Sequence, residues 1–215
     1  MPCAFDFQLF AAEHLERCCF RRDPKRPYIS RAVFCYQSAT VYLKRYDLSV
    51  WAGTRKWFLE LFARCELIEK ITHGHTRFIF SNRVLYRISV PVQGLQGCGL
   101  SFRLTSCAYG KLVQTIVNAH ALGVVHGDIS ARNINARADG LDIFDWEPIL
   151  LAPGAASSKV PVPEYLTDPR CWLGSCDLLA RVKEKASVYE IDYQGLVNIR
   201  THFCEKAMGR KNMKA

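Results

Sequence analysis

The sequence predicts an α+β fold in which strands dominate the first 92 residues and helices dominate the remainder. Three observations lead to this prediction: two pairs of β-branched and aromatic runs, amphipathic stretches around them, and a glycine-rich linker at Gln93–Gly99. Period-two alternation favours half-buried strands, and apolar residues three and four apart favour helices. We therefore expect two regions: 1–92, an N-terminal helix with a small β-rich lobe, and 93–215, a larger helical lobe.

The elements of the first region follow in order. Phe5–Cys19 has apolar residues at helical spacing and ends near a basic breaker at Arg21–Pro24. Two hairpins are expected on either side of a second helix, because the short turns Gln37-Ser38 and Ser81-Asn82 interrupt extended runs. The elements are the strands Tyr28–Tyr36 and Ala39–Tyr46, the helix Thr54–Ile71, and the strands Thr76–Phe80 and Arg83–Val90.

The second region is expected to be mainly helical. Ser106–Leu122 carries apolar residues along one side and leads through Gly123–Val125 into a polar stretch. Asn135–Gly140 predicts a turn between two short extended runs, and Ala152–Pro163 predicts a loop. The remainder is predicted to be mostly helical, with these core positions: Ile191, Leu196, Ile199 and Phe203.

Composition describes an ordinary globular chain of 215 residues, 49% hydrophobic and 23% charged, with enough apolar material for a core. No run approaches the length of a membrane span, and Met1–Phe10 lacks the pattern of a secretory signal. We therefore expect no transmembrane segment and a cytoplasmic location. The ten cysteines form no Cys-X-X-Cys pair and no zinc-like spacing, which indicates reduced thiols.

The formal net charge is +9, and the basic excess is concentrated near the ends, at Arg17–Arg26 and Arg210–Lys214. This balance favours anionic partners such as nucleotide phosphates, nucleic acid or an acidic membrane surface. The alternative is a solvated, solubilising surface with a frayed basic tail. Nucleic acid is disfavoured because the chain has no motif of interleaved aromatic and basic residues.

The most specific motif is His126-Gly-Asp128-Ile-Ser-Ala-Arg-Asn133, followed by Leu-Asp-Ile-Phe-Asp145-Trp. It supplies one carboxylate that can accept a hydroxyl proton, then an amide oxygen and a second carboxylate suited to Mg²⁺. An alternative interpretation makes these polar groups turn residues around the hairpin predicted at Asn135–Gly140. That alternative accounts for the turn itself but not for the polar groups on both of its flanks.

The motif resembles the catalytic loop and metal-binding strand of the protein-kinase-like superfamily, which have the same residue types at this spacing. The His-Gly-Asp form, with Asp-Trp-Glu in place of Asp-Phe-Gly, is closest to the bacterial lipopolysaccharide-core sugar kinases and aminoglycoside phosphotransferases. The resemblance runs weakly from about Tyr28 to Phe203 and is specific over Val124–Trp146. It implies a two-lobed kinase-like fold, with the catalytic loop in the helical lobe.

The resemblance also implies the activity: transfer of the γ-phosphoryl group of ATP, with Mg²⁺, to a hydroxyl acceptor. A sugar, glycan or other small hydroxyl-bearing molecule is preferred over a protein acceptor. Two alternatives remain at this stage. One is an atypical protein Ser/Thr kinase of the compact RIO-like type, and the other is a catalytically inactive pseudokinase that acts as a binding module.

Residue roles follow from the same resemblance. Asp128 would accept the acceptor's proton, and Asn133 and Asp145 would hold Mg²⁺ across the β- and γ-phosphates. His126 is expected to support the loop by packing. Asp192, in Tyr-Glu-Ile-Asp-Tyr, would anchor the catalytic-loop backbone, although a surface position on a helix is an equal alternative.

Lys44, in Tyr-Leu-Lys-Arg-Tyr, resembles the strand lysine that contacts the α- and β-phosphates. If it is exposed instead, Arg45 would be the inward residue. Glu60 is chosen as its helical carboxylate partner because its sequence distance suits compact kinases. On a helical wheel Glu69 lies nearer the apolar stripe, with Glu66 between the two.

The chain departs from the family at three places. Ser30–Ala39 contains no glycine, so a phosphate-covering loop at Gln37-Ser38 would lack a permissive backbone. Gly127 replaces the arginine that usually contacts a phosphorylated activation loop. Ser130 stands where protein Ser/Thr kinases usually have a lysine, although Arg132 lies nearby. These departures predict weak nucleotide affinity and no switching through that loop.

Overall fold

The computed structural model describes residues 5–36, 39–49, 55–90, 95–96, 106–137, 140–148, 176–183 and 188–212. The chain divides into two compact units. The first unit is Met1–Val92 with Pro169–Cys171, and the second is Gln93–Asp168 with Trp172–Ala215. The predicted loop Ala152–Pro163 and the predicted turn Gln37-Ser38 lie outside the described residues.

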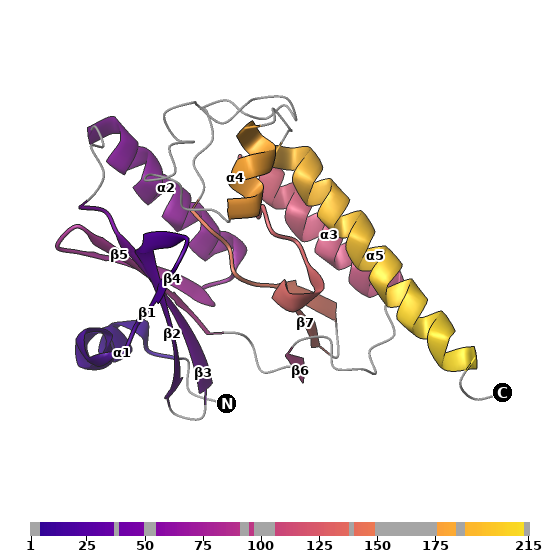
Figure 1. Cartoon of the computed structure of the whole chain (residues 1–215), viewed down its shortest axis with the longest axis horizontal. Helices are drawn as coiled ribbons and strands as arrows, with labels where there is room; N and C mark the ends of the chain where they lie inside the picture. The colour runs from indigo at the N-terminus through magenta and orange to yellow at the C-terminus, as the bar shows by residue number, and fades with distance from the viewer. Residues whose placement is uncertain are drawn as a thin grey trace. The chain divides into compact units, whose positions relative to one another are not determined.

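The first unit is built on a five-stranded antiparallel sheet with the strand order β1-β2-β3-β5-β4 (Figure 1). Its strands are β1 (Arg21–Asp23), β2 (Arg26–Tyr36), β3 (Ala39–Asp47), β4 (Thr76–Ser81) and β5 (Val84–Ser89). The sequence predicted four of these strands to within a few residues. It missed β1, because Arg21–Pro24 was interpreted as a breaker.

One face of this sheet is covered by α1 (Phe7–His14). The Asp6 carboxylate caps the helix by accepting hydrogen bonds from the backbone N–H groups of Gln8 at 3.0 Å and Leu9 at 2.9 Å. A short 3₁₀ turn, Leu15–Arg17, follows the helix. The core on this face combines residues of the helical segment with alternate residues of β3 and β5: Phe10, Leu15, Val41, Leu43 and Ile88.

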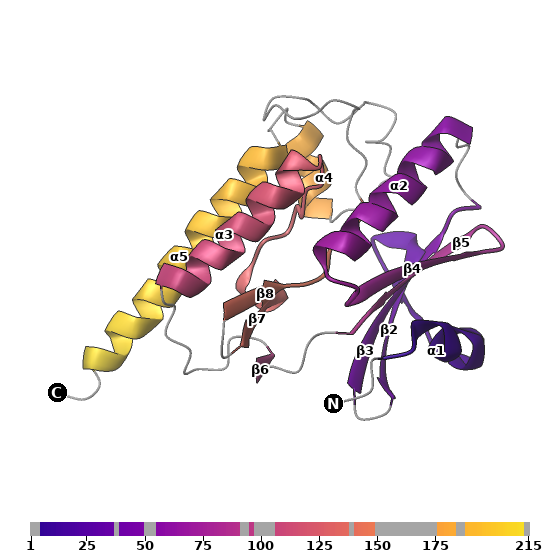
Figure 2. The ribbon, with the colours of Figure 1, turned by 180° about the vertical axis from the view of Figure 1, so that it is seen from behind.

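The opposite face of the sheet carries α2 (Arg55–Ile71). Phe62 of α2 packs against Phe80 of β4, with ring centroids 3.8 Å apart. Phe80 alternates with Ile79, which contacts the α1 core, so α2 and α1 lie on different faces. Figure 2 shows the two helices on either side of the strands.

The second unit contains a pair of long helices and a small sheet. The helices α3 (Ser106–Ala121) and α5 (Val188–Asn212) lie side by side in both views, and the Tyr109 hydroxyl donates to the Leu196 carbonyl at 3.0 Å (Figures 1 and 2). The sheet has the order β6-β7-β8, and a further helix is α4 (Cys176–Lys183). Its strands are β6 (Leu95–Gln96), β7 (Ile134–Arg137) and β8 (Gly140–Ile143).

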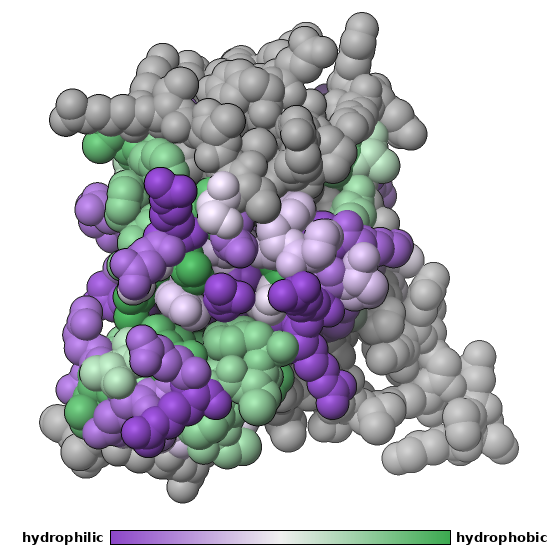
Figure 3. All heavy atoms as spheres, turned by 60° about the vertical axis from the view of Figure 1, so that its left-hand side comes forward, coloured by the Kyte–Doolittle hydropathy of each residue, from purple (hydrophilic) through white to green (hydrophobic). Residues whose placement is uncertain are grey.

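These findings confirm the predicted α+β class. Ile191, Leu196 and Ile199 are buried as expected, whereas the side chain of Phe203 lies outside the described part. None of the helices in the described residues combines the length and apolar character that a membrane crossing needs. On the face drawn in Figure 3, hydrophilic side chains in purple are interspersed with apolar ones in green.

Candidate functional site

The loop that carries the motif begins where α3 ends. Gly123 adopts a left-handed backbone with φ of 69°, which an L side chain would resist. Its N–H donates to the His120 carbonyl and the next N–H, of Val124, donates to the Ala119 carbonyl, both at 2.8 Å. This pattern terminates the helix and directs the buried residues Val124 and Val125 into the loop.

Asp192 of α5 holds the backbone of this loop. The side chain is fully buried, and its carboxylate accepts the backbone N–H of His126 at 2.8 Å and that of Gly127 at 2.7 Å. The imidazole of His120 lies 2.9 Å from the same carboxylate. The anchoring contact predicted for Asp192 is therefore present. Its cost of burial is offset by two backbone donors and a histidine, which is the arrangement that a buried charge needs.

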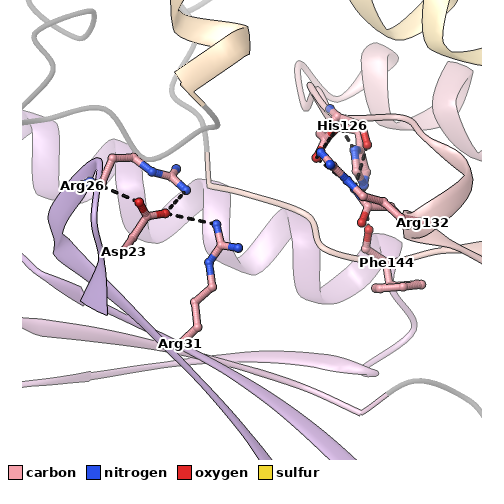
Figure 4. A network of polar contacts seen from close by, with 8 residues as sticks. Asp23, Arg26, Arg31, His126, Arg132 and Phe144 are labelled. Carbon is pink, nitrogen blue, oxygen red and sulfur yellow. Dashed lines mark hydrogen bonds and ion pairs between the residues drawn. The ribbon is translucent and has the colours of Figure 1, made fainter. Parts of the chain in front are cut away.

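His126 connects the loop to the strand that precedes Asp145. Its Nδ1 accepts the backbone N–H of Asp128 at 3.2 Å, so in the neutral ring Nε2 bears the proton. Nε2 lies 2.8 Å from the Phe144 carbonyl and donates to it (Figure 4). The ring also packs edge-on against Trp146, with centroids 4.8 Å apart. His126 thus supports the loop, as predicted, and both of its nitrogens are engaged.

Asp128 is half-buried and has two side-chain neighbours. Arg132 donates from Nη2 to both carboxylate oxygens, at 3.0 and 2.8 Å, although 71% of the Arg132 side chain is exposed. The amide nitrogen of Asn133 donates to the Asp128 carbonyl at 2.8 Å and to its carboxylate at 3.1 Å. Because that nitrogen is committed to Asp128, the amide oxygen is the atom of Asn133 that can face a cation.

Asp145, the third residue of the motif, follows the hairpin β7–β8. Phe144 continues the ladder beyond β8, since its N–H donates to the Asn133 carbonyl at 3.0 Å. Asp145 then takes a left-handed backbone with φ of 71°. In the described ranges, the other non-glycine residues with positive φ are at the end of α2 and in the β4–β5 turn, where such angles are common. Strain at Asp145 outside a hairpin turn is typical of a functional position.

The donor chemistry of this site fits a hard divalent cation. Asn133 and Asp145 would supply oxygen ligands, which Mg²⁺ prefers together with water and phosphate oxygens. Among the described residues, no group of three or more His, Cys, Asp and Glu side chains is arranged to hold a metal ion. The predicted pair contains only one such residue, so its proposed role depends on phosphate as an additional ligand.

Lys44 and Glu60 belong to the first unit. Lys44 is 5% exposed on β3, on the α2 face of the sheet, so the alternative of an exposed strand lysine is wrong. Arg45 lies on the other face and is half-buried. Glu60 is half-buried on α2. Whether it contacts Lys44 stays a prediction.

The two other glutamates of α2 are less suited to the lysine. Glu69 is committed to β4, because its carboxylate accepts Arg77 Nη1 and the Phe78 backbone N–H, each at 2.7 Å. Glu66 is exposed. Glu60 therefore remains the predicted partner of Lys44.

Two residues of the site were not found from the sequence. His120 supports the Asp192 carboxylate, and Gly195 lies so close to Ile129 that an added Cβ would be 2.6 Å from the Ile129 Cβ. The spacing of Asp192 and Gly195, three residues apart, places both on one face of α5. That spacing is the signal that would have indicated a helix face packed against a loop.

No protein-family model matches this chain, and no curated protein matches its sequence significantly. The residues and their geometry therefore carry the functional argument.

Proposed function

We propose that the protein is an ATP-dependent phosphotransferase of the protein-kinase-like type, transferring the γ-phosphoryl group to a hydroxyl acceptor. A sugar or other small molecule is the preferred acceptor. The two units would correspond to the small and large lobes of that fold. The single observation that carries the proposal is the buried Asp192 carboxylate holding the backbone of His126 and Gly127.

That anchor matters because phosphoryl transfer depends on positioning and electrostatics more than on covalent chemistry. The anchored loop presents Asp128, which would accept the proton of the acceptor hydroxyl as the bond to phosphorus forms. A bound Mg²⁺ would neutralise charge on the β- and γ-phosphates. Asn133 and Asp145 would hold it, while Lys44, oriented by Glu60, would contact the α- and β-phosphates.

The Arg132–Asp128 contact is compatible with this role. An ion pair with so exposed an arginine contributes little, about 0.2–1 kcal/mol, so substrate can displace it readily. Once released from Asp128, the Arg132 guanidinium would remain close to the reacting centre. It would supply the positive charge that a lysine supplies in protein Ser/Thr kinases, at the position where this chain has Ser130. Arg132 is thus suited to contact the transferred phosphoryl group.

The decisive experiment is a transfer screen with labelled ATP and Mg²⁺ against sugars, glycolipids, aminoglycosides and a generic protein. We expect transfer by the unaltered protein and loss of at least about 100-fold in Asp128→Asn, which removes a general base. Glu190→Gln on exposed α5 surface is the matched control and should retain activity.

A second measurement separates the alternatives. Mg-ATP should raise the midpoint of thermal unfolding, and the stabilisation should grow as the logarithm of one plus the ratio of the Mg-ATP concentration to Kd. Stabilisation without transfer to any acceptor would support a pseudokinase. Transfer only to protein would support the RIO-like alternative, and the absence of both effects at millimolar Mg-ATP would refute the proposal.

A further inference from the structure

Four basic residues occupy one row across the sheet of the first unit. Arg21 of β1 pairs with Arg31 of β2, Arg31 with Lys44 of β3, and Lys44 with Arg87 of β5. Directly paired residues of antiparallel strands project from the same face, with Cβ atoms about 4.5–5.5 Å apart. The four side chains are therefore successive neighbours on one face of the sheet.

The row runs from the interior of the sheet to its edge. Arg87 and Lys44 are 1% and 5% exposed, whereas Arg31 and Arg21 are exposed. Like charges placed directly opposite each other on a sheet repel, so such a row is costly in itself. The segment Arg21–Arg31 contains five basic residues and one acidic residue, Asp23, which leaves a strong local excess of positive charge.

Asp23 organises the exposed end of the row. Its carboxylate accepts from Arg26 Nη2 at 2.8 Å and from Arg31 Nη2 at 3.4 Å, and Figure 4 shows both guanidinium groups directed at it. The same carboxylate closes the β1–β2 turn by accepting the backbone N–H groups of Lys25 and Arg26, at 3.0 and 3.2 Å. Pro24, the remaining turn residue, has no N–H.

This turn therefore differs from the one expected to cover phosphates. The β2–β3 hairpin predicted around Gln37-Ser38 is present, because Tyr36 pairs with Ala39. The additional strand β1 forms an earlier hairpin with β2, which closes at Asp23–Arg26. A glycine-rich loop binds phosphate through free backbone N–H groups. Here the amides of Lys25 and Arg26 are engaged by Asp23, so positive charge at this hairpin comes from side chains.

An open cavity of about 640 Å³ lies beside the row, and Arg21, Arg22 and Arg31 contribute to its lining. Its volume is within the range of about 300–1,000 Å³ that small-molecule sites occupy. Its remaining lining residues include one acidic side chain, Asp23. A cavity whose lining includes three arginines and one aspartate suits a multiply charged anion.

We propose that the exposed end of the row, Arg21 and Arg31, binds an oligophosphate chain through side-chain charge, in place of glycine-loop amides. The inference rests on the proposed function in naming a nucleoside triphosphate as the natural ligand. Arg21 and Arg31 would contact the phosphates from the β1–β2 edge of the sheet.

The test uses inorganic triphosphate, which carries the charge of the nucleotide without its base or sugar. Binding to the full-length chain is measured by calorimetry at low and physiological salt. We expect the double variant Arg21→Gln/Arg31→Gln to lose roughly 100-fold in affinity, at roughly tenfold for each charged hydrogen bond removed. Arg31→Lys should lose less, because it keeps the charge but not the bidentate geometry.

The control is Lys70→Gln/Arg83→Gln, which removes two exposed charges from the same unit, away from the row. It should bind triphosphate as the unaltered protein does. Unliganded thermal midpoints show whether each variant is folded. Equal affinity in both double variants, or no triphosphate binding by any of the folded proteins, would overturn the inference.

The same measurements distinguish this inference from the proposed function. Triphosphate binding that depends on Arg21 and Arg31, together with an absence of Asp128-dependent transfer, would retain the anion site and refute the phosphotransferase. Asp128-dependent transfer with unchanged triphosphate affinity in Arg21→Gln/Arg31→Gln would do the reverse. Adenosine serves as the uncharged probe, and its affinity should be the same in every variant.

Discussion

Gly195→Ala tests how closely α5 approaches the loop that carries Asp128. An alanine Cβ at this position would lie 2.6 Å from the Ile129 Cβ and 2.8 Å from the Ile129 carbonyl oxygen. Ordinary carbon contacts are about 3.5–4.0 Å, so the loop or the helix must move by roughly 1 Å. Overpacking of this kind costs about 1–3 kcal/mol, which exceeds the gain of about 1 kcal/mol in helix propensity.

Gly110→Ala is the matched control. Gly110 is also helical, in α3, and its added Cβ would meet nothing within 4 Å. Only the propensity term applies there, so Gly110→Ala should stabilise the protein by about 0.5–1 kcal/mol. The two variants should therefore shift the urea midpoint in opposite directions relative to the unaltered protein.

Activity gives a second readout of the same perturbation. Ile129 follows Asp128 directly, so a displaced loop should lower ATP turnover in Gly195→Ala and leave it unchanged in Gly110→Ala. A Gly195→Ala protein as stable as Gly110→Ala, with full turnover, would falsify the close approach of helix and loop.

Three further predictions concern individual groups. Asp192→Asn should lower the free energy of unfolding by about 2–4 kcal/mol, because the neutral amide can accept only one of the two backbone N–H groups well. Hydrogen exchange at the His126 amide should also accelerate. An unchanged exchange rate would contradict the anchoring role. Burial alone would raise the pKa of Asp23, but the hydrogen bond and charge of Arg26 lower it below its usual value. The stabilisation that the ionised Asp23 carboxylate provides is thus complete above about pH 4 and is lost as pH falls through the folded pKa. The difference in urea midpoint between the unaltered protein and Asp23→Asn should therefore shrink on acidification. A constant difference would contradict this. Burial raises the pKa of the Cys65 thiol well above its usual value. Alkylation at pH 8, followed by mass spectrometry, should therefore label the exposed Cys19 long before Cys65. Equal labelling of the two cysteines would contradict the burial of Cys65.

The sequence predicted the elements whose signal is local. The helices α2 and α3 and the strands β2 to β5 follow from apolar spacing and from turn residues, which act over a few positions. The motif Asp128–Asn133 and Asp145 was also found locally, because its residues lie within one loop and one hairpin. Helix propensity and strand alternation are sufficient in such cases.

What the sequence missed depends on tertiary contact. β1 has three residues, all charged, and exists because it pairs with a neighbour and because Asp23 closes the turn. The His120–Asp192 contact joins residues 72 positions apart, for which periodicity offers no signal. The contacts of Glu69 with Arg77 and Phe78 of β4 likewise depend on how α2 packs, which a helical wheel does not show.

Two backbone hydrogen bonds of Phe144 couple the segment before Asp145 to the loop that carries Asp128. One side of this residue is tied to Asn133 and the other to His126, so the strand before Asp145 and the loop bearing Asp128 form a single clamped unit. A ligand that displaces Asp145 should therefore also displace His126. A shift at Asp128 or Asp145 would be transmitted to the other residue, and to α5 through Asp192.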